Sequence, residues 1–278
     1  MQVASCQLVS GQCCWYDNYI NFNIKSEYMN YNIYFSPTGG TKRVADILAN
    51  NLSGKYVEID LCHDIEKMTL NSDDVCLFSV PSFAGRVPAI NTERIRKISG
   101  NGARAILNCV YGNREWDDTL TELQDVLEEQ GFICISAVAA VAEHSILRQF
   151  ATGRPDKKDE ADLISFAKQI QIKLDNNEVM TTKLTGNHNT YKEHNRSSWK
   201  PNGSEACISC GLCAKECPVE AIDINNLRTT DKEKCFNCMR CITFCPVHAR
   251  NLDEEFLKTM SERMTPVLSG RKDNYLFL

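Results

Sequence analysis

From residue 31 onward, the chain alternates strand-length apolar runs with amphipathic stretches of helical period. The stripe Val44, Ile47, Leu48 and Leu52 is typical of these stretches. The apolar runs predict five strands, at residues 31–35, 56–60, 75–80, 103–110 and 132–141. Strands that alternate with helices predict an α/β fold with a doubly wound, parallel five-stranded sheet. The commonest strand order for such a sheet at this size is 2-1-3-4-5.

The remaining segments differ from the sheet region in composition. Residues 1–28 lack the pattern of a secretory signal, and we expect a poorly ordered N-terminal extension there. The sheet domain then covers residues 29–175. Residues 176–205 are polar and rich in turn-forming residues, which predicts a flexible linker with a typical reach of roughly 30 Å. A small cysteine-rich domain follows at residues 206–252, and residues 253–278 predict a helix and a short tail.

Eight of the fifteen cysteines form two runs of identical spacing, C-x₂-C-x₂-C-x₃-C-P. The first run consists of Cys207, Cys210, Cys213 and Cys217, and the second of Cys235, Cys238, Cys241 and Cys245. Each cysteine of the first run recurs 28 positions later, so the segment is an internal duplication. This spacing is the one by which thiolates hold a [4Fe–4S] cluster, and two runs predict two clusters.

In proteins with two such runs, the fourth cysteine of each run binds the other cluster. By that rule, cluster I takes Cys207, Cys210, Cys213 and Cys245, and cluster II takes Cys217, Cys235, Cys238 and Cys241. Structural zinc is the main alternative, but it prefers two pairs of ligands separated by a longer spacer. Disulfides are the other alternative, and nothing marks the chain as secreted.

Chain length, net charge and cysteine content limit the possible classes of function. A chain of 278 residues is too long for a small cluster-binding protein alone and predicts a second, larger domain. The formal charge is −5, and each oxidised cluster would add roughly two negative charges, which argues against a nucleic-acid partner. No apolar run approaches the ~20 residues that span a bilayer, so we expect no membrane partner. The cysteine usage favours a reducing, oxygen-poor compartment, and we expect a cytoplasmic protein.

In a 2-1-3-4-5 sheet, the carboxyl ends of strands 1, 3 and 4 are neighbours, and ligands bind at that point. The loop after strand 1 is rich in hydroxyls and glycine and opens directly into a helix, which suits a phosphate group. The loops after strands 3 and 4 contain glycine and aromatic residues, which suit a planar ring. The three loops are residues 36–41, 81–88 and 111–116. Taken singly, Phe83, Tyr111 and Trp116 could be plain packing; the isolated His63 and His144 are expected to be structural.

The three loops and the cysteine repeat resemble those of known families. The three loops look like the FMN-binding loops of flavodoxins, and the cysteine repeat resembles a bacterial two-cluster ferredoxin with a small α+β fold. Residues 29–252 are similar to the flavodoxin–ferredoxin fusion proteins of anaerobes. The resemblance implies FMN phosphate contacts at Ser36, Thr38, Gly39, Gly40 and Thr41. It implies flavin-ring contacts at Pro81, Ser82, Phe83, Ala84, Gly85, Arg86, Tyr111, Gly112 and Asn113.

The sequence therefore predicts an electron-transfer flavoprotein that passes low-potential electrons between two [4Fe–4S] clusters and FMN. Its partner would be a redox protein that donates or accepts electrons, with a small-molecule acceptor as a further possibility. One alternative is a flavin-dependent reductase of a small organic substrate, shaped by Arg86, Arg114 or Trp116. Another is an iron–sulfur redox sensor that turns nothing over. The sequence names neither donor, acceptor nor oligomeric state.

Overall fold

A computed structural model describes residues 29–193 and 197–278, and the predicted extension at residues 1–28 lies outside this part of the chain. The larger domain is built on five parallel strands in the order β2-β1-β4-β6-β7. Numbered by the parallel strands alone, this is the predicted 2-1-3-4-5 order, so the flavodoxin-like fold is confirmed. The strands are β1 (Asn30–Tyr34), β2 (Tyr56–Asp60), β4 (Val75–Pro81), β6 (Arg104–Tyr111) and β7 (Ile133–Val141).

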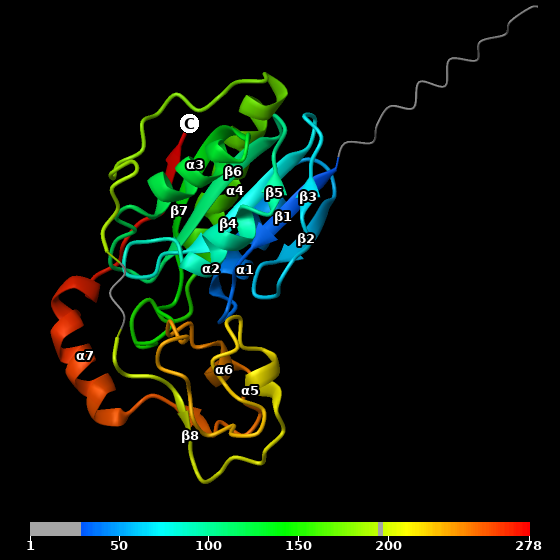
Figure 1. Ribbon diagram of the computed structural model, residues 1–278. Helices are drawn as coiled ribbons and strands as arrows, with labels where there is room; N and C mark the ends of the chain where they lie inside the picture. Colours follow the sequence, from blue (N-terminus) through cyan, green and yellow to red (C-terminus); the bar gives the residue numbers. More distant parts are fainter. Residues whose placement is uncertain (1–28, 194–196) are drawn as a thin grey trace, which may run out of the picture.

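Helices cover both faces of this sheet (Figure 1). On one face, α1 (Gly40–Ala49) and α4 (Lys157–Asp175) pack apolar side chains such as Leu48 and Leu163 against the strands. On the other face, Ile95 of α2 (Ala89–Ile95) and Leu123 of α3 (Thr119–Glu129) enter the second core. Every residue of β4 is buried, as its continuous apolar sequence predicts for a strand covered on both sides. A short parallel pair, β3 (Met68–Thr69) and β5 (Ile98–Ser99), lies beside the main sheet.

The sheet has a sixth strand that the sequence analysis did not predict. The C-terminal tail forms β10 (Tyr275–Phe277), which pairs antiparallel with β7 at the edge of the sheet. Leu276 packs into the core on the α4 side, and Phe277 packs on the opposite side. This alternation is the two-residue period of a strand, but three residues are too few to reveal it in the sequence.

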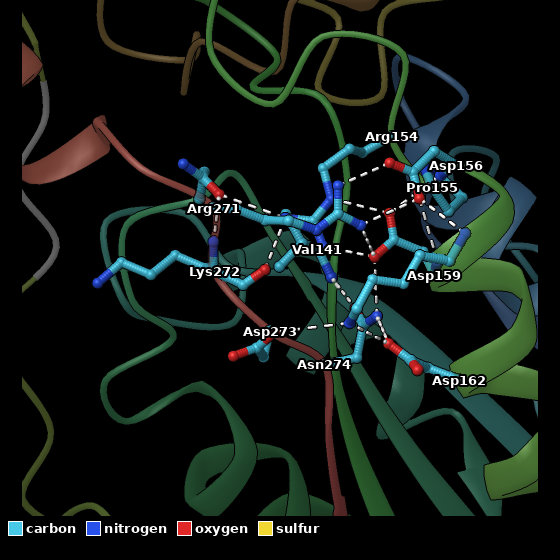
Figure 2. A network of polar contacts seen from close by, with 12 residues as sticks. Val141, Arg154, Pro155, Asp156, Asp159, Asp162, Arg271, Lys272, Asp273 and Asn274 are labelled. Atoms are coloured by element: carbon cyan, nitrogen blue, oxygen red, sulfur yellow. Dashed lines mark hydrogen bonds and ion pairs between the residues drawn. The ribbon is translucent and has the colours of Figure 1, made fainter.

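A buried polar network fastens this tail to the amino end of α4 (Figure 2). The side chain of Asn274 accepts a hydrogen bond from the Val141 amide at 2.9 Å and donates one to Asp159 at 2.9 Å. Arg154 binds the Asp159 carboxylate through two nitrogens and also donates to the carbonyl of Lys272 at 2.8 Å. Burial acts to raise the pKa of Asp159, but the bonds from Arg154 and Asn274 help to outweigh it and hold the pKa below its usual range.

The cysteine-rich domain repeats its backbone as well as its sequence. Two one-turn helices, α5 (Leu212–Lys215) and α6 (Arg240–Thr243), stand 28 positions apart. Three pairs of residues with the same offset have positive φ: Ser209 and Asn237, Gly211 and Met239, and Glu220 and His248. A two-stranded ribbon, β8 (Asn202–Gly203) with β9 (Arg250–Asn251), closes the domain, and α7 (Glu254–Leu268) leads out of it.

The segment predicted as a flexible linker is not a free spacer. On α3, Asp125 binds the imidazole of His188 at 2.6 Å, and the preceding Asp118 accepts the Lys192 amide at 2.8 Å. Beyond the cysteine repeat, α7 and β10 return to the sheet (Figure 1). The small domain is thus attached to the large one at both of its ends, which corrects the expectation of a single mobile tether.

We predict that Asn274→Ala destabilises the protein, because the Val141 amide and the Asp159 carboxylate lose buried partners. The expected cost is about 2 kcal/mol, which corresponds to a fall in the thermal midpoint of about 4–8 °C. The control is Lys272→Ala, since the Lys272 ammonium contacts no described residue, and its midpoint should stay close to wild type. An unchanged midpoint for Asn274→Ala would contradict this account of the tail.

Candidate cofactor sites

The four cysteines of the second predicted cluster line one cavity. They are Cys217 from the first run and Cys235, Cys238 and Cys241 from the second. Among the described residues, no three side chains of His, Cys, Asp or Glu converge as around a single metal ion. The backbone amides of Ala221 and Ala249 donate to the sulfurs of Cys217 and Cys245 at 3.2 and 3.1 Å, again 28 positions apart. Such amide donors stabilise thiolate sulfur, so the residues suit an iron–sulfur cluster.

The cysteines of the first predicted cluster differ in exposure. Cys213 is buried and packs with Cys207 and Cys241, whereas Cys210 is exposed to solvent. Burial raises the pKa of Cys213, and it raises the pKa of Cys241 to about 11. These thiols therefore keep their protons at neutral pH until a metal displaces them.

Four other cysteines belong to the sheet domain and have no role at either site. Cys62, Cys76, Cys109 and Cys134 are buried, and none of the cysteines described by the structure forms a disulfide. Burial raises the pKa of Cys62 to about 12 and also raises the pKa of the other three. They behave as small apolar side chains of the core.

The predicted phosphate loop lies between β1 and the amino end of α1. Its Ser36 hydroxyl accepts the Lys42 amide at 2.8 Å, which fixes the turn into the helix. Gly39 has a φ of 90°, and a side chain on Gly40 would press against Ala142 at 3.2 Å. The hydroxyls of Thr38 and Thr41 bind no other described residue, and the first turn of α1 holds no acidic residue. Free hydroxyls at a helix amino end form a suitable site for a phosphate group.

A large cavity of about 1080 Å³ opens beside this loop. Most of the residues implied by the flavodoxin resemblance line it: Thr38, Gly40, Thr41, Pro81, Ser82, Phe83, Ala84, Gly85, Tyr111 and Gly112. Ser36 and Gly39 of the phosphate loop are not among the lining residues. The loops after β1, β4 and β6 thus come together at the carboxyl edge of the sheet, as the strand order predicts.

The loop after β4 is a tight turn with a fixed shape. Phe83 and Arg86 exchange backbone hydrogen bonds at 3.0 and 3.2 Å, and the two residues between them have positive φ. A side chain on Gly85 would lie 2.1 Å from the Asp117 carboxylate, so only glycine fits there. The turn presents Phe83 and Ala84 to the cavity.

Two of the residues implied for the flavin ring do not line the cavity. Arg86 pairs with Glu122 through two bonds of 2.7 Å, and Glu122 also accepts the Val87 amide. This pair joins the turn to α3. Asn113 donates to the carbonyls of Leu268 and Gly270 at 2.7 and 2.8 Å and thereby holds the segment after α7. Both residues therefore hold the loops around the cavity in place without lining it.

The sequence analysis missed a fourth loop and two further walls of the cavity. Residues 142–146 follow β7 at the same edge, and His144 among them lines the cavity. Burial lowers the pKa of His144 to about 4, and its Nδ1 accepts the amides of Ile146 and Leu147, so the ring is neutral at pH 7. Its place directly after the fifth predicted strand was the signal available in the sequence.

Helix α7 and the small domain supply those further walls. Met260 and Met264 of α7 face the cavity, and the ring of Trp199 stacks on Phe256 with centroids 5.3 Å apart. Met residues are ordinary core residues in a helical pattern, so their placement over a cavity cannot be read from sequence. Because α7 bridges the two domains, the cavity lies between them.

The two domains meet at a contact that joins both cavities. Phe236, next to Cys235, has its ring 6.2 Å from that of Phe35 and 6.1 Å from that of Phe83. Phe236 and Val219 line both the cysteine cavity and the large cavity. The buried Arg94 of α2 donates to the carbonyl of Pro218 at 2.8 Å and fixes the same junction.

Comparison with known proteins gives one family match and several similar structures. Residues 206–249 match the 4Fe-4S dicluster domain family. Solved structures similar to the chain include a flavodoxin from Streptococcus pneumonia TIGR4, at 16% identity and a TM-score of 0.39 over 52% of this chain and 99% of that one. An NAD(P)H:quinone oxidoreductase from Methanothermobacter marburgensis is 14% identical, with a TM-score of 0.35 over 56% of this chain and 100% of that one.

No curated protein sequence matches the chain significantly. The strand order itself identifies the fold of the larger domain, and the family match identifies the smaller one. An iron–sulfur segment of this family supports a redox role in electron transfer. Residues 206–249 thus match the 4Fe-4S dicluster domain family, and with the flavodoxin-like sheet before them the architecture fits a flavodoxin–ferredoxin fusion.

Proposed function

We propose that this protein is an electron-transfer iron–sulfur flavoprotein that exchanges low-potential electrons between two [4Fe–4S] clusters and FMN. The observation that carries the proposal is the shared wall between the two cavities. Val219 and Phe236 line both the cavity of four cysteines and the cavity at the carboxyl edge of the sheet. Cofactors in these cavities would be neighbours within one chain.

Each cofactor has a defined set of residues in this proposal. Cys207, Cys210, Cys213 and Cys245 would hold cluster I, and Cys217, Cys235, Cys238 and Cys241 would hold cluster II. Thr38, Thr41 and the backbone amides of residues 38–41 would bind the FMN phosphate, and Phe83, Ala84, Tyr111 and Gly112 would contact the ring. When bound, the clusters supply one-electron transfer, and FMN accepts two electrons in two such steps.

The positions of the cysteines indicate where electrons would enter the protein and in which direction they would flow. The cavity of the cysteines assigned to cluster II shares Val219 and Phe236 with the large cavity. Cys210, assigned to cluster I, is exposed, and Ile208 in the same run is 61% exposed. A reduced carrier protein would therefore deliver electrons at cluster I. The acidic surface charge of the chain favours such a redox partner over a nucleic acid. No helix in residues 29–193 or 197–278 is long and apolar enough to cross a membrane.

A second candidate function is reduction of a small organic molecule by the flavin. The cavity of about 1080 Å³ reaches the upper limit of the ~300–1,000 Å³ usual for one ligand, so a second molecule has room beside FMN. The sequence suggested Arg114 and Trp116 as pocket residues. Arg114 lines the cavity, although it is paired with Asp117, whereas Trp116 does not line it and packs against the Tyr275 ring at 5.2 Å. A substrate would meet Arg114, His144 and the apolar face of α7.

The crossed ligation of the clusters is tested by comparing cysteine variants. Wild type, purified anaerobically, should contain about eight irons per chain. Cys217→Ser should lose the same cluster as Cys238→Ser, because both residues are assigned to cluster II. The two variants should therefore show the same residual electron paramagnetic resonance spectrum. The control is Cys210→Ser, which removes a cluster I ligand. A Cys217→Ser spectrum that matches Cys210→Ser would refute the crossover.

The FMN site is tested by removing the two free hydroxyls of the phosphate loop. Thr38→Ala combined with Thr41→Ala should weaken FMN binding by roughly 100-fold, because each hydroxyl would bond a charged phosphate. Affinity is measured by fluorescence quenching of FMN titrated with the flavin-free protein. Thr152→Ala, at an exposed loop away from the cavity, is the control. Unchanged FMN affinity in the double variant, or a preference for FAD in wild type, would overturn the assignment.

Transfer between the domains is tested by anaerobic stopped-flow. Rapid reduction of the clusters should be followed by flavin reduction at a rate independent of protein concentration, because the small domain is held at both ends. Cys238→Ser should abolish this phase, whereas Cys210→Ser should retain it when cluster II is reduced directly. A rate that rises in proportion to protein concentration would mean transfer between molecules, and the relay within one chain would be wrong.

A further inference from the structure

The small domain contains a fully buried arginine whose charge is unpaired. Arg250 begins β9 and is 1% exposed, the largest of the fully buried side chains described. Its two terminal nitrogens donate to the carbonyls of Leu227 and Pro201, the latter at 2.7 Å, and to the Thr230 hydroxyl. All of these partners are uncharged.

The charge of Arg250 is therefore uncompensated by the part of the protein that the structure describes. No carboxylate among these residues forms an ion pair with it, and its Nε–H has no hydrogen-bond acceptor. A guanidinium stays protonated in proteins, so the charge cannot be lost by titration. A buried cation without a counter-ion costs several kcal/mol, which implies an anionic group in its immediate surroundings.

Anion-forming cysteines of both predicted clusters lie beside this charge. A terminal nitrogen of Arg250 lies 4.0 Å from the sulfur of Cys213, which belongs to cluster I. Cys213 packs in one buried cluster with Cys241, which belongs to cluster II. Pro201 and Thr230, which accept hydrogen bonds from Arg250, line the cavity of the cluster II cysteines. One guanidinium thus lies beside cysteines of both predicted clusters.

The internal duplication offers a built-in comparison. The position equivalent to Arg250 in the first repeat, 28 residues earlier, is Ile222, which is buried among apolar side chains. The two repeats otherwise share their helices and their positive-φ residues. The repeat fold therefore accepts an apolar residue at this position, and the arginine serves something other than packing.

We propose that Arg250 is the resident counter-cation of both [4Fe–4S] clusters and raises the reduction potential of each. The inference rests on the proposed function. Each cluster becomes more negative by one charge when it takes one electron from an external reductant. A buried positive charge, together with N–H donors toward the cluster sulfurs, stabilises the reduced form more than the oxidised form. Arg250 acts on the potentials without ligating iron, so it is a positioning residue.

The test is a potentiometric titration of the iron-loaded protein, with dithionite as reductant and paramagnetic resonance of the reduced clusters as readout. Arg250→Gln removes the charge but keeps polar contacts, and Arg250→Ile copies the first repeat. In either variant, the equilibrium constant for reduction of each cluster should fall at least tenfold, which is about 59 mV for one electron. Arg250→Lys keeps the charge and should give a smaller fall.

Two internal controls accompany these variants. Arg228→Ile removes an arginine that is 51% exposed and paired with Glu205 in the same domain, so both cluster potentials should stay near wild type. The flavin potential should not move in any variant, because Arg250 lies inside the other domain.

Three outcomes would overturn the inference. They are unshifted potentials in an Arg250→Gln or Arg250→Ile protein that holds its full iron content, a shift of one cluster only, and equal shifts with Gln and Lys. If Arg250→Ile fails to bind iron, Arg250→Gln alone decides. A wild-type chain without two clusters would refute the proposed function itself, and iron analysis shows this before any variant is made.

Discussion

The pairing of β10 with β7 is the constraint on which the arrangement of the two domains depends. Because the tail ends as a strand of the sheet, α7 cannot swing free, and it must cross from the small domain back to the large one. That path places Met260 and Met264 over the cavity at the carboxyl edge of the sheet. A three-residue strand alone would be a weak anchor, and the buried network around Asp159 and Asn274 supplies the rest.

Several buried arginines join segments that are distant in the sequence. Arg154 holds the tail through Asp159, Arg94 joins α2 to the carbonyl after Cys217, and Arg250 ties Leu227 to Pro201 within the small domain. Each guanidinium offers several donors in a rigid plane, so one side chain can satisfy carbonyls from two segments at once. The Asp159 carboxylate balances the charge of Arg154. Arg250 has only uncharged hydrogen-bond partners, so the anionic clusters would act as counter-ions of Arg250.

The candidate sites show how far reasoning from sequence reaches. The three glycine-rich loops were found because the parallel strand order brings their ends to one edge, and the structure brings most of their residues to one cavity. The resemblance to flavodoxins implied ring contacts at Arg86 and Asn113, although their side chains turn to Glu122 and to the chain after α7. Side-chain direction depends on which charged or polar partner lies nearby, and that partner is remote in sequence. His144 was expected to be structural, because a single histidine carries no motif, but it lines the cavity.

The sequence by itself determined the features that depend on local spacing. The cysteine runs and their 28-residue repeat dictate the duplicated backbone, and the apolar period predicts the five strands. The strand order followed from the commonest topology of such a sheet, which the structure has. The tertiary structure alone decided the sixth strand, the anchored course of residues 176–193, the position of α7 over the cavity and the neighbours of Arg250. Hydrophobic periodicity shows which face of a segment is buried, but not which residues cover that face. The neighbours are decided only when segments distant in the sequence pack together and exclude water from the same space.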